Sequence, residues 1–189
     1  MTKRELRKVF KEKRKSLSAA ERAKLDDLML IQFQTVDLPF IYSLLTYWPM
    51  EYHSEPNTHL FTDYIEFRNP ELKIAYPRIE LTGDKMVAIL IDKETAFRKN
   101  SFGTYEPENT ETIRPDAFDM VFVPLLAIDM NGYRVGYGKG FYDRFLADCC
   151  EDCLKVGFSY FEPVEQISDK HEFDVPLNLC ITPQSVYVF

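Results

Sequence analysis

Hydrophobic residues recur at helical spacing in the first part of the chain, and this pattern predicts two helices. Leu6, Val9, Phe10 and Leu17 fall on one face of a helix whose other positions are largely Lys and Arg. A second helix begins at Ser18, where Ser-Ala-Ala-Glu is the pattern of a capping box, and extends to about residue 33. The same reasoning predicts helices over residues 57–68 and 141–152.

Runs of apolar, aromatic and β-branched residues between these helices predict strands. They lie at residues 40–48, 72–76, 86–91, 119–123, 154–159 and 185–189. Residues 92–118 show no clear period and are predicted to be rich in loop. Because alternating strands and helices are typical of a largely parallel sheet, we predict an α/β fold, a three-layer α/β/α sandwich. Without an internal repeat or a linker, residues 1–189 are expected to form a single domain.

The composition supports a packed protein and excludes a membrane span. Hydrophobic residues make up 46% of the chain and charged residues 28%, which is enough for a large core. The longest apolar stretch, residues 121–128, contains a proline and is much shorter than the about 20 residues of a membrane-spanning helix. No apolar stretch follows the basic start, so we expect no secretory signal and no membrane partner.

The four cysteines indicate a reducing compartment. Three of them lie between residues 149 and 153, on the helix predicted there, and no second CxxC pair exists. This arrangement favours free thiols in the cytoplasm over a disulfide framework or a zinc site.

The charge is divided unevenly along the chain. Residues 1–24 hold ten Lys and Arg against three Glu, a net charge of +7, whereas the other 165 residues carry −14. A nucleic-acid-binding tail is not supported, because no aromatic-interleaved RNA motif accompanies this arm and the rest is acidic. We therefore expect no nucleic-acid partner. Two interpretations of the arm, about residues 1–17, stay open: a solvated helix face, or Lys3 and Arg7 folded over a phosphate site while the other cations face solvent.

A cluster of glycines is the sharpest chemical signal in the sequence. Four of the seven glycines lie at positions 132, 136, 138 and 140, between the strand at 119–123 and the helix that begins at Phe141, and Arg134 and Lys139 lie among them. Glycine lets backbone N–H groups approach an anion closely, and a helix N-terminus adds donors. The pattern predicts a phosphate-binding loop, although neither the Walker nor the dinucleotide-binding spacing is present. A flexible surface loop without a ligand is the alternative.

Three carboxylates are candidates for the same site. Asp143 lies in the first turn of the helix after the glycines, where it suits either Mg²⁺ beside bound phosphates or the helix dipole. Asp174 is a second carboxylate that could share the ion. Glu55 follows the first predicted strand, where parallel sheets place ligands, although a solvated loop acid is the plainer alternative. The three histidines have no metal-ligand spacing and no nucleophile context, so no hydrolytic triad is indicated.

One segment resembles the signature of a known enzyme family. Residues 129–146 read DMNGYRVGYGKGFYDRFL, close to the DxxGxRLGxGxGYYDRxL of the 5-formyltetrahydrofolate cyclo-ligases, also called methenyltetrahydrofolate synthetases. Supporting matches run in order over residues 2–183. Lys3 to Arg7 resembles KxxLR, Glu55 to Thr58 resembles ExxT, Tyr76 to Arg78 resembles the PR strand end, Phe102 to Pro107 resembles FGxxEP, and His171 to Asp174 resembles the HD segment.

The resemblance implies a role for each matching residue. ATP would be bound by Lys3, Arg7 and the loop formed by Arg134, Val135, Gly136, Tyr137, Gly138, Lys139, Gly140, Phe141 and Tyr142. Mg²⁺ would be held by Asp143 and Asp174. Folate would contact Met50 and Glu55, and Tyr137, Gly138, Lys139, Gly140 and Phe141 would line the boundary between the two substrates. We expect Arg134, Lys139 and Arg7 to offset charge on the transferring phosphate.

Two residues depart from the family signature. Val135 replaces the usual Leu, which is a conservative core change. Phe141 replaces the first Tyr of YYD, so the ring stays available for stacking on folate while a phenolic hydrogen bond is lost.

The function implied by the resemblance is ATP- and Mg²⁺-dependent conversion of 5-formyltetrahydrofolate to 5,10-methenyltetrahydrofolate, with release of ADP and phosphate. We expect small-molecule substrates only and a monomer or weak dimer. A non-catalytic nucleotide- or phosphosugar-binding module is the alternative, and it would need neither Glu55 nor the KxxLR arm. A sugar-phosphate isomerase would require a general base that the sequence does not locate.

Overall fold

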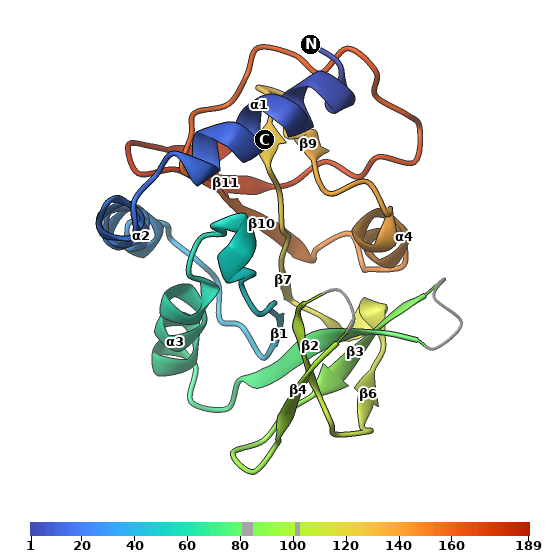
Figure 1. Ribbon diagram of the computed structural model, residues 1–189. Coiled ribbons are helices and arrows are strands. Elements are labelled where there is room, and N and C mark those ends of the chain that lie inside the picture. The colour runs from blue at the N-terminus through green and yellow to red at the C-terminus, as the bar shows by residue number, and fades with distance from the viewer. Residues whose placement is uncertain (81–84, 101–102) are drawn as a thin grey trace.

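The computed structural model describes residues 1–80, 85–100 and 103–189. In these residues, eight strands form a central sheet in the order β12-β11-β10-β7-β1-β2-β3-β6 (Figure 1). Parallel pairing joins its middle strands: β11 (Leu179–Ile181), β10 (Leu154–Phe158), β7 (Met120–Phe122), β1 (Ser43–Leu45) and β2 (Lys73–Ile79). Antiparallel strands extend both edges: β12 (Val186–Val188) on one side, and β3 (Met86–Leu90) and β6 (Thr112–Ile113) on the other. The prediction of a largely parallel sheet is confirmed.

Two helices, α2 (Ala19–Gln34) and α3 (Thr58–Arg68), cover one face of the sheet (Figure 1). Because successive strand residues point to opposite faces, Leu44, Phe122 and Phe158 turn towards these helices and pack with Phe33 and Phe61. Phe33 meets the other three rings edge to face, which is the favoured geometry of aromatic pairs. The capping box predicted at the start of α2 is present.

Helix α4 (Phe141–Ala147) covers the opposite face and completes the three layers. Leu45, Val121 and Cys180 point to this side and pack with Phe145 and Leu146. The helix is shorter than the predicted 141–152, because the chain turns after Ala147 to enter β10. The three clustered cysteines therefore follow the helix and do not lie on it. All four cysteines are free thiols.

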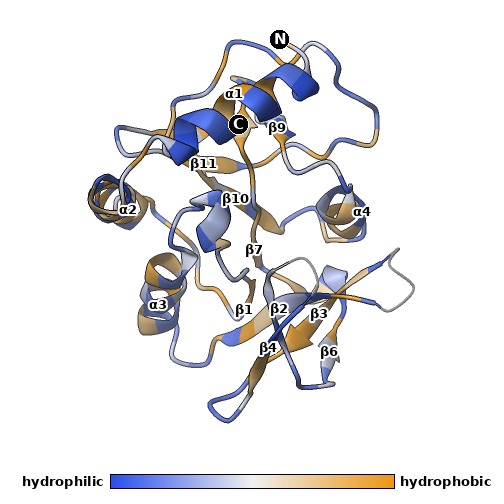
Figure 2. Cartoon of the chain, in the orientation of Figure 1, coloured by the Kyte–Doolittle hydropathy of each residue, from blue (hydrophilic) through white to orange (hydrophobic). Residues whose placement is uncertain are grey.

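Helix α1 (Lys3–Lys15) crosses the carboxyl edge of the sheet. Leu6 and Phe10 on its inner side pack with Val135 and Ile167 and with the hairpin of β8 (Ala127–Ile128) and β9 (Arg134–Val135). Its outer positions are hydrophilic (Figure 2). The expectation that arm cations other than Lys3 and Arg7 face solvent is wrong for Arg14, which is only 1% exposed. Arg14 follows Leu6 and Phe10 at four-residue spacing, which places it on the buried side of the helix.

The structure refines the predicted strands in two segments, residues 92–118 and residues 40–48. Residues 92–118 are rich in loop, as predicted, but they also contain short elements that the sequence did not reveal: a ladder of β4 (Phe97–Lys99) and β5 (Tyr105–Pro107), the edge strand β6 and the 3-10 turn η2 (Pro115–Ala117). The predicted strand at 40–48 is reduced to β1, because the chain leaves the sheet to form the turn η1 (Glu51–His53). No helix in the described part of the chain is long and apolar enough to cross a membrane.

Candidate active site

A cavity of about 310 Å³ lies at the carboxyl ends of β1, β2 and β7, beneath α1 and beside the start of α4. Tyr47 and Trp48 reach it just after β1, Pro77 from β2, and Pro124 just after β7. This edge is where parallel α/β sheets bind ligands, and the volume suits a small molecule.

Backbone conformation and charge set up one side of the cavity, where the predicted glycine loop lies. Gly138 and Gly140 have backbone φ angles of +96° and +69°, which residues other than glycine rarely adopt. Arg7 of α1 folds over this loop, and its Nε donates to the carbonyl of Gly136 at 2.9 Å. Lys139 is exposed on the loop and takes no ion pair among the described residues. Two cations and several backbone N–H groups therefore border the cavity, as a phosphate group requires.

Gly132 does not belong to this loop, which corrects the predicted four-glycine site. It lies in the turn of the β8–β9 hairpin, and a Cβ there would come within 2.9 Å of the Leu177 carbonyl oxygen. The turn is held by Asp129, which is fully buried and whose Oδ1 accepts hydrogen bonds from the backbone of Asn131 and Tyr133 at 3.0 Å. The first Asp and Gly of the signature thus shape the hairpin that carries Arg134 to the cavity.

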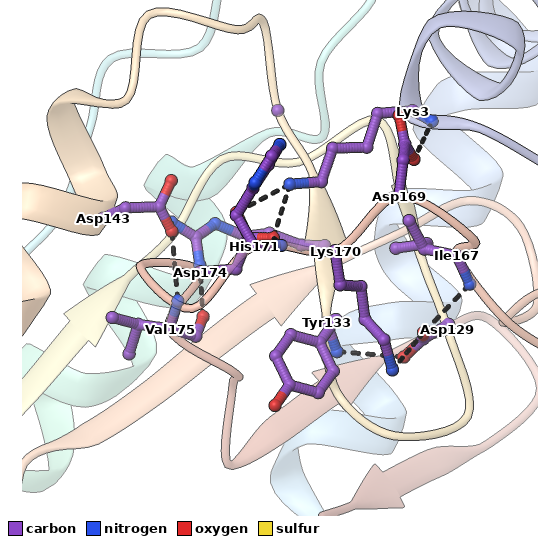
Figure 3. Close-up of polar contacts among 12 residues, drawn as sticks. Lys3, Asp129, Tyr133, Asp143, Ile167, Asp169, Lys170, His171, Asp174 and Val175 are labelled. Carbon is purple, nitrogen blue, oxygen red and sulfur yellow. Dashed lines mark hydrogen bonds and ion pairs between the residues drawn. The ribbon is translucent and has the colours of Figure 1, made fainter.

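Two acidic residues meet two basic ones at the end of the cavity near the chain start, as Figure 3 shows for Lys3, Asp143 and Asp174. Lys3 Nζ lies 2.5 Å from Asp174 Oδ2, and Arg134 Nη2 lies 2.9 Å from Asp143 Oδ1. The backbone of Val175 also donates to Asp143 Oδ1. Burial alone would raise the pKa of Asp174, but the hydrogen bond from the His171 backbone and the ammonium of Lys3 hold it below its usual value. Asp174 therefore stays ionised at neutral pH.

The donor set at this end fits Mg²⁺ only together with a bound nucleotide. Among the described residues, no group of three or more His, Cys, Asp or Glu side chains could hold a metal ion. Asp143 and Asp174 are two carboxylates on one cavity wall, and Asp143 Oδ2 takes no hydrogen bond from the described residues. Mg²⁺ commonly uses one or two carboxylates and completes its octahedron with phosphate oxygens and water. The two aspartates match that pattern.

Glu55 lies on another wall of the cavity in a hydrogen-bonded network. Its Oε1 accepts from the hydroxyl of Tyr137 at 2.5 Å, and its Oε2 accepts from the backbone N–H of Met50 at 2.7 Å. Burial raises the pKa of this carboxyl group, while the charge of Arg14 lowers it. Glu55 is therefore a buried acceptor and not the solvated loop acid that the sequence also allowed.

Aromatic residues beside Glu55 form a part of the site that sequence reasoning missed. Trp48, Tyr52 and Tyr105 line the cavity, and the rings of Trp48 and Tyr105 lie 4.9 Å apart. The ring of His53 stacks on Tyr137 at 4.7 Å. The sequence contained one signal for this wall, the aromatic run that ends at Trp48, a few residues before Glu55. Tyr105 lies on β5, a strand that the sequence did not reveal.

The structure brings together nearly all of the site residues predicted from sequence. Fourteen of them line the cavity: Lys3, Arg7, Met50, Glu55, Arg134, Gly136, Tyr137, Gly138, Lys139, Gly140, Phe141, Tyr142, Asp143 and Asp174. Val135 does not, because its side chain is buried against Leu6 and Phe10. Of the FGxxEP match, Glu106 lines the cavity and Phe102 lies outside the described residues.

The fold and the site define a class: an α/β protein whose cavity joins a cationic glycine loop to an aromatic wall and so suits an anionic and a planar ligand together. A model of the 5-formyltetrahydrofolate cyclo-ligase family matches residues 1–183. The chain therefore belongs to this family, which is a family of ligase enzymes, and it is not a non-catalytic binding module.

Individual relatives agree with this membership. A 5-formyltetrahydrofolate cyclo-ligase of Mycoplasma pneumoniae is 30% identical over 97% of this chain and 100% of its own length. The NMR structure of an Aquifex aeolicus 5,10-methenyltetrahydrofolate synthetase has a TM-score of 0.82 at 29% identity and covers 100% of this chain and 93% of that one. A 5,10-methenyltetrahydrofolate synthetase structure from Mycoplasma pneumoniae has a TM-score of 0.74 at 26% identity, over 97% and 99% of the two chains.

Proposed function

We propose that the protein converts 5-formyltetrahydrofolate to 5,10-methenyltetrahydrofolate and consumes ATP, with Mg²⁺, to form ADP and phosphate. The observation that carries the proposal is that one cavity holds both kinds of binding surface. Arg7, Lys139 and the glycine loop suit a triphosphate, and Trp48 and Tyr105 suit a planar heterocycle. A nucleotide-binding module alone would not need the second surface.

The nucleotide side would use the chain start and the glycine loop. Lys3, Arg7 and residues 134–142 are proposed to bind ATP, with Val135 contributing through its backbone because its side chain is buried. Asp143 and Asp174 would hold Mg²⁺, which neutralises phosphate charge when bound. Arg134 is 8% exposed and keeps Asp143 in place. From the cavity wall, the positive charge of Arg134 would offset charge on the transferring phosphate.

The folate side would use Glu55 and the residues around it. A carboxylate has four acceptor sites, and Tyr137 and Met50 occupy two of them, so Glu55 keeps capacity for N–H donors of a reduced pterin. Met50, Tyr137, Gly138, Lys139, Gly140 and Phe141 would line the boundary where the two substrates meet. Phe141 would stack on the folate without adding a hydroxyl.

The chemistry needs no nucleophile from the protein. A formamide oxygen is a poor leaving group, and transfer of the γ-phosphoryl group to it would give an iminium-like phosphorylated intermediate. N10 of the same folate then attacks the activated carbon and loses its proton, and phosphate leaves with that oxygen. Because phosphoryl transfer depends on positioning and charge neutralisation, Lys139 and Arg7 are suitable groups for the work.

The test is the near-ultraviolet absorbance of the methenyl product. Purified protein is incubated with 5-formyltetrahydrofolate, with and without ATP and Mg²⁺, and the absorbance should rise only in the complete mixture. Lys139→Ala should slow the reaction strongly, whereas Lys8→Ala, at an exposed position of α1, serves as the matched control. Absence of an ATP-dependent signal would contradict the proposal.

Three further expectations accompany this function. The four free cysteines support a reducing cytoplasmic location. We also expect a monomer or weak dimer without a nucleic-acid partner. Gel filtration and a nucleic-acid binding assay would check these two predictions.

A further inference from the structure

Arg14 is a buried cation outside the cavity that the proposed reaction has not used. It lies in the last turn of α1 and is 1% exposed, although the helix has seven other Lys and Arg residues. A guanidinium stays charged at every physiological pH, so its burial is unfavourable unless nearby groups compensate the charge.

The contacts of Arg14 lead to the cavity. Its Nη2 donates to the carbonyl of Leu125, and its Nη1 donates to the hydroxyl of Tyr137 at 3.4 Å. Its Nε is buried and has no hydrogen-bond partner among the described residues. No carboxylate in the described part of the chain forms a direct ion pair with Arg14, so the nearest compensating charge is reached through Tyr137.

The direction of the hydrogen bonds joins Arg14 to Glu55. Because the hydroxyl of Tyr137 donates its one proton to Glu55, it accepts from Arg14. The chain of donors runs from Arg14 to Tyr137 to Glu55. Tyr137 and Glu55 face the cavity and Arg14 does not.

We infer that Arg14 is a positioning residue for the folate end of the site: through Tyr137, it holds the Glu55 carboxyl group aimed at the substrate, and its buried positive charge favours the carboxylate form. This inference rests on the proposed function. An ionised Glu55 offers only acceptors to the pterin, whereas a protonated one would present an O–H group and lose one acceptor.

The electrostatics of the surrounding groups agree with this role. Burial raises the pKa of Glu55, and the charge of Arg14 is the largest influence that opposes burial. The other titratable groups facing Glu55 are the hydroxyls of Tyr47, Tyr137 and Tyr142, each with a pKa raised by burial, so they stay neutral. Met50 adds only a backbone N–H, and His53, two residues away, has its pKa lowered by burial. Lys11 Nζ lies 5.7 Å from the centre of the Tyr137 ring, but Arg14 is the cation that lowers the pKa of Glu55 itself.

The first test follows the ionisation of Glu55 without relying on activity. Infrared spectra of Arg14→Gln at neutral pH should show a stronger protonated-carboxyl stretch than the wild type, and the added band should disappear in Arg14→Gln/Glu55→Gln. Arg4→Gln, an exposed arginine on the same helix, should resemble the wild type. Tyr137→Phe breaks the relay while leaving Arg14 in place and should give the same band as Arg14→Gln, so the question can be answered even if Arg14→Gln fails to fold.

The second test measures binding of 5-formyltetrahydrofolate against pH in the absence of ATP. In Arg14→Gln, the loss of binding at acidic pH should move upward by about 1 to 3 pH units, because removal of a nearby opposite charge shifts a carboxyl group by that much. Tyr137→Phe removes a hydrogen bond to the carboxylate and should move the loss in the same direction. Arg14→Lys should restore the wild-type pH dependence, which a purely structural role would not predict. In Arg14→Gln, whose side chain does not line the cavity, the KM for ATP should change much less than the KM for folate.

The outcomes separate this inference from the proposed function. Folded Tyr137→Phe, or folded Arg14→Gln, with a wild-type pH profile and no added protonated-carboxyl band would overturn the role of Arg14. If the band appears but the wild type neither binds formylfolate nor forms product, the coupling of Arg14 to Glu55 stands. In that case the proposed function fails, and with it the positioning role.

Discussion

Asp26 is a buried carboxyl group whose ionisation should make stability depend on pH. It lies on α2 and is 6% exposed, and its Oδ1 accepts a hydrogen bond from the backbone of Asn57 at the start of α3. Burial raises the pKa of Asp26 to about 6, which the bond from Asn57 only partly offsets. The folded state therefore binds this proton more tightly than the unfolded chain, in which a normal value near 3.8 applies.

The prediction is that the Asp26 contribution is fully present below about pH 4 and is lost as the pH rises through about 6. Asp26→Asn keeps the acceptor for Asn57 but cannot ionise, so its free energy of unfolding should vary less between pH 4 and pH 7. Urea denaturation at several pH values measures this difference, and the neighbouring exposed Asp27→Asn is the control. Parallel curves for the wild type and Asp26→Asn would refute the assignment.

Asp143 allows a separate test of the proposed metal site. Asp143→Asn preserves the size of the side chain and can still accept from Arg134 and Val175, but it removes the charge next to the proposed nucleotide site. We expect a higher Mg²⁺ concentration for half-maximal activity and a lower turnover at saturating folate and ATP. The control is Asp148→Asn, just beyond α4 and exposed to solvent. Wild-type Mg²⁺ dependence in Asp143→Asn would mean that Asp143 serves only the hydrogen-bond network.

At the scale of the elements, the loop between β9 and α4 depends on backbone conformation as much as on its charges. Gly138 has a φ of +96° and lies beside the guanidinium of Arg7, so a Cβ there would be 3.4 Å from that side chain. Gly136, two residues earlier, has an ordinary φ, and its nearest neighbour would be 4.0 Å from a Cβ. Position 138 therefore requires a glycine for its backbone conformation, whereas position 136 has room for a small side chain.

Gly138→Ala should lower the free energy of unfolding by about 1 to 3 kcal/mol, the usual effect of forcing a side chain into this backbone region. Gly136→Ala should leave it unchanged or slightly raise it, since alanine reduces the freedom of the unfolded chain. Urea denaturation of both variants gives the comparison. Equal destabilisation of the two variants would show that the positive φ of Gly138 is not what distinguishes this position.

Helix α1 has two different faces, and both matter for the site. Leu6 and Phe10 attach the helix to the β8–β9 hairpin, and this attachment brings Lys3 and Arg7 over the glycine loop. The basic arm is therefore neither a free tail nor only a solvated face, because its position is set by apolar packing on its inner side.

At the scale of the whole molecule, the site depends on contacts between the two ends of the chain. Lys3 pairs with Asp174 across 171 positions in the sequence. Ligand that binds only this folded arrangement must stabilise the protein as a whole. ATP with Mg²⁺ at about 100 times its Kd should add about 2.7 kcal/mol to the free energy of unfolding.

A thermal-shift experiment checks this prediction. The Tm should rise with ATP and Mg²⁺ in the wild type and in the exposed control Lys8→Ala, and it should rise less in Lys139→Ala. The measurement needs no folate, so it tests nucleotide binding separately from the reaction. An unchanged Tm in the wild type would contradict the placement of ATP in this cavity.

The sequence by itself determined the parts of the protein that depend on neighbouring residues. Helical periodicity and the capping box at Ser18 located α2, and the alternation of strands and helices indicated a parallel sheet with three layers. The signature around residues 129–146 indicated the family. These signals are local, because helix caps, amphipathic faces and glycine-rich turns act over a few residues.

Only the tertiary structure decided what each signature residue does. Gly132 and Gly138 look alike in the sequence, yet Gly132 shapes a hairpin against Leu177 and Gly138 borders the cavity. Arg4 and Arg14 lie on one helix, yet one faces solvent and the other is buried beside Tyr137. The physical reason is that burial and charge compensation depend on residues far away in the sequence, such as Leu177 for Gly132 and Tyr137 for Arg14, and the chain brings these together only when the sheet and helices pack.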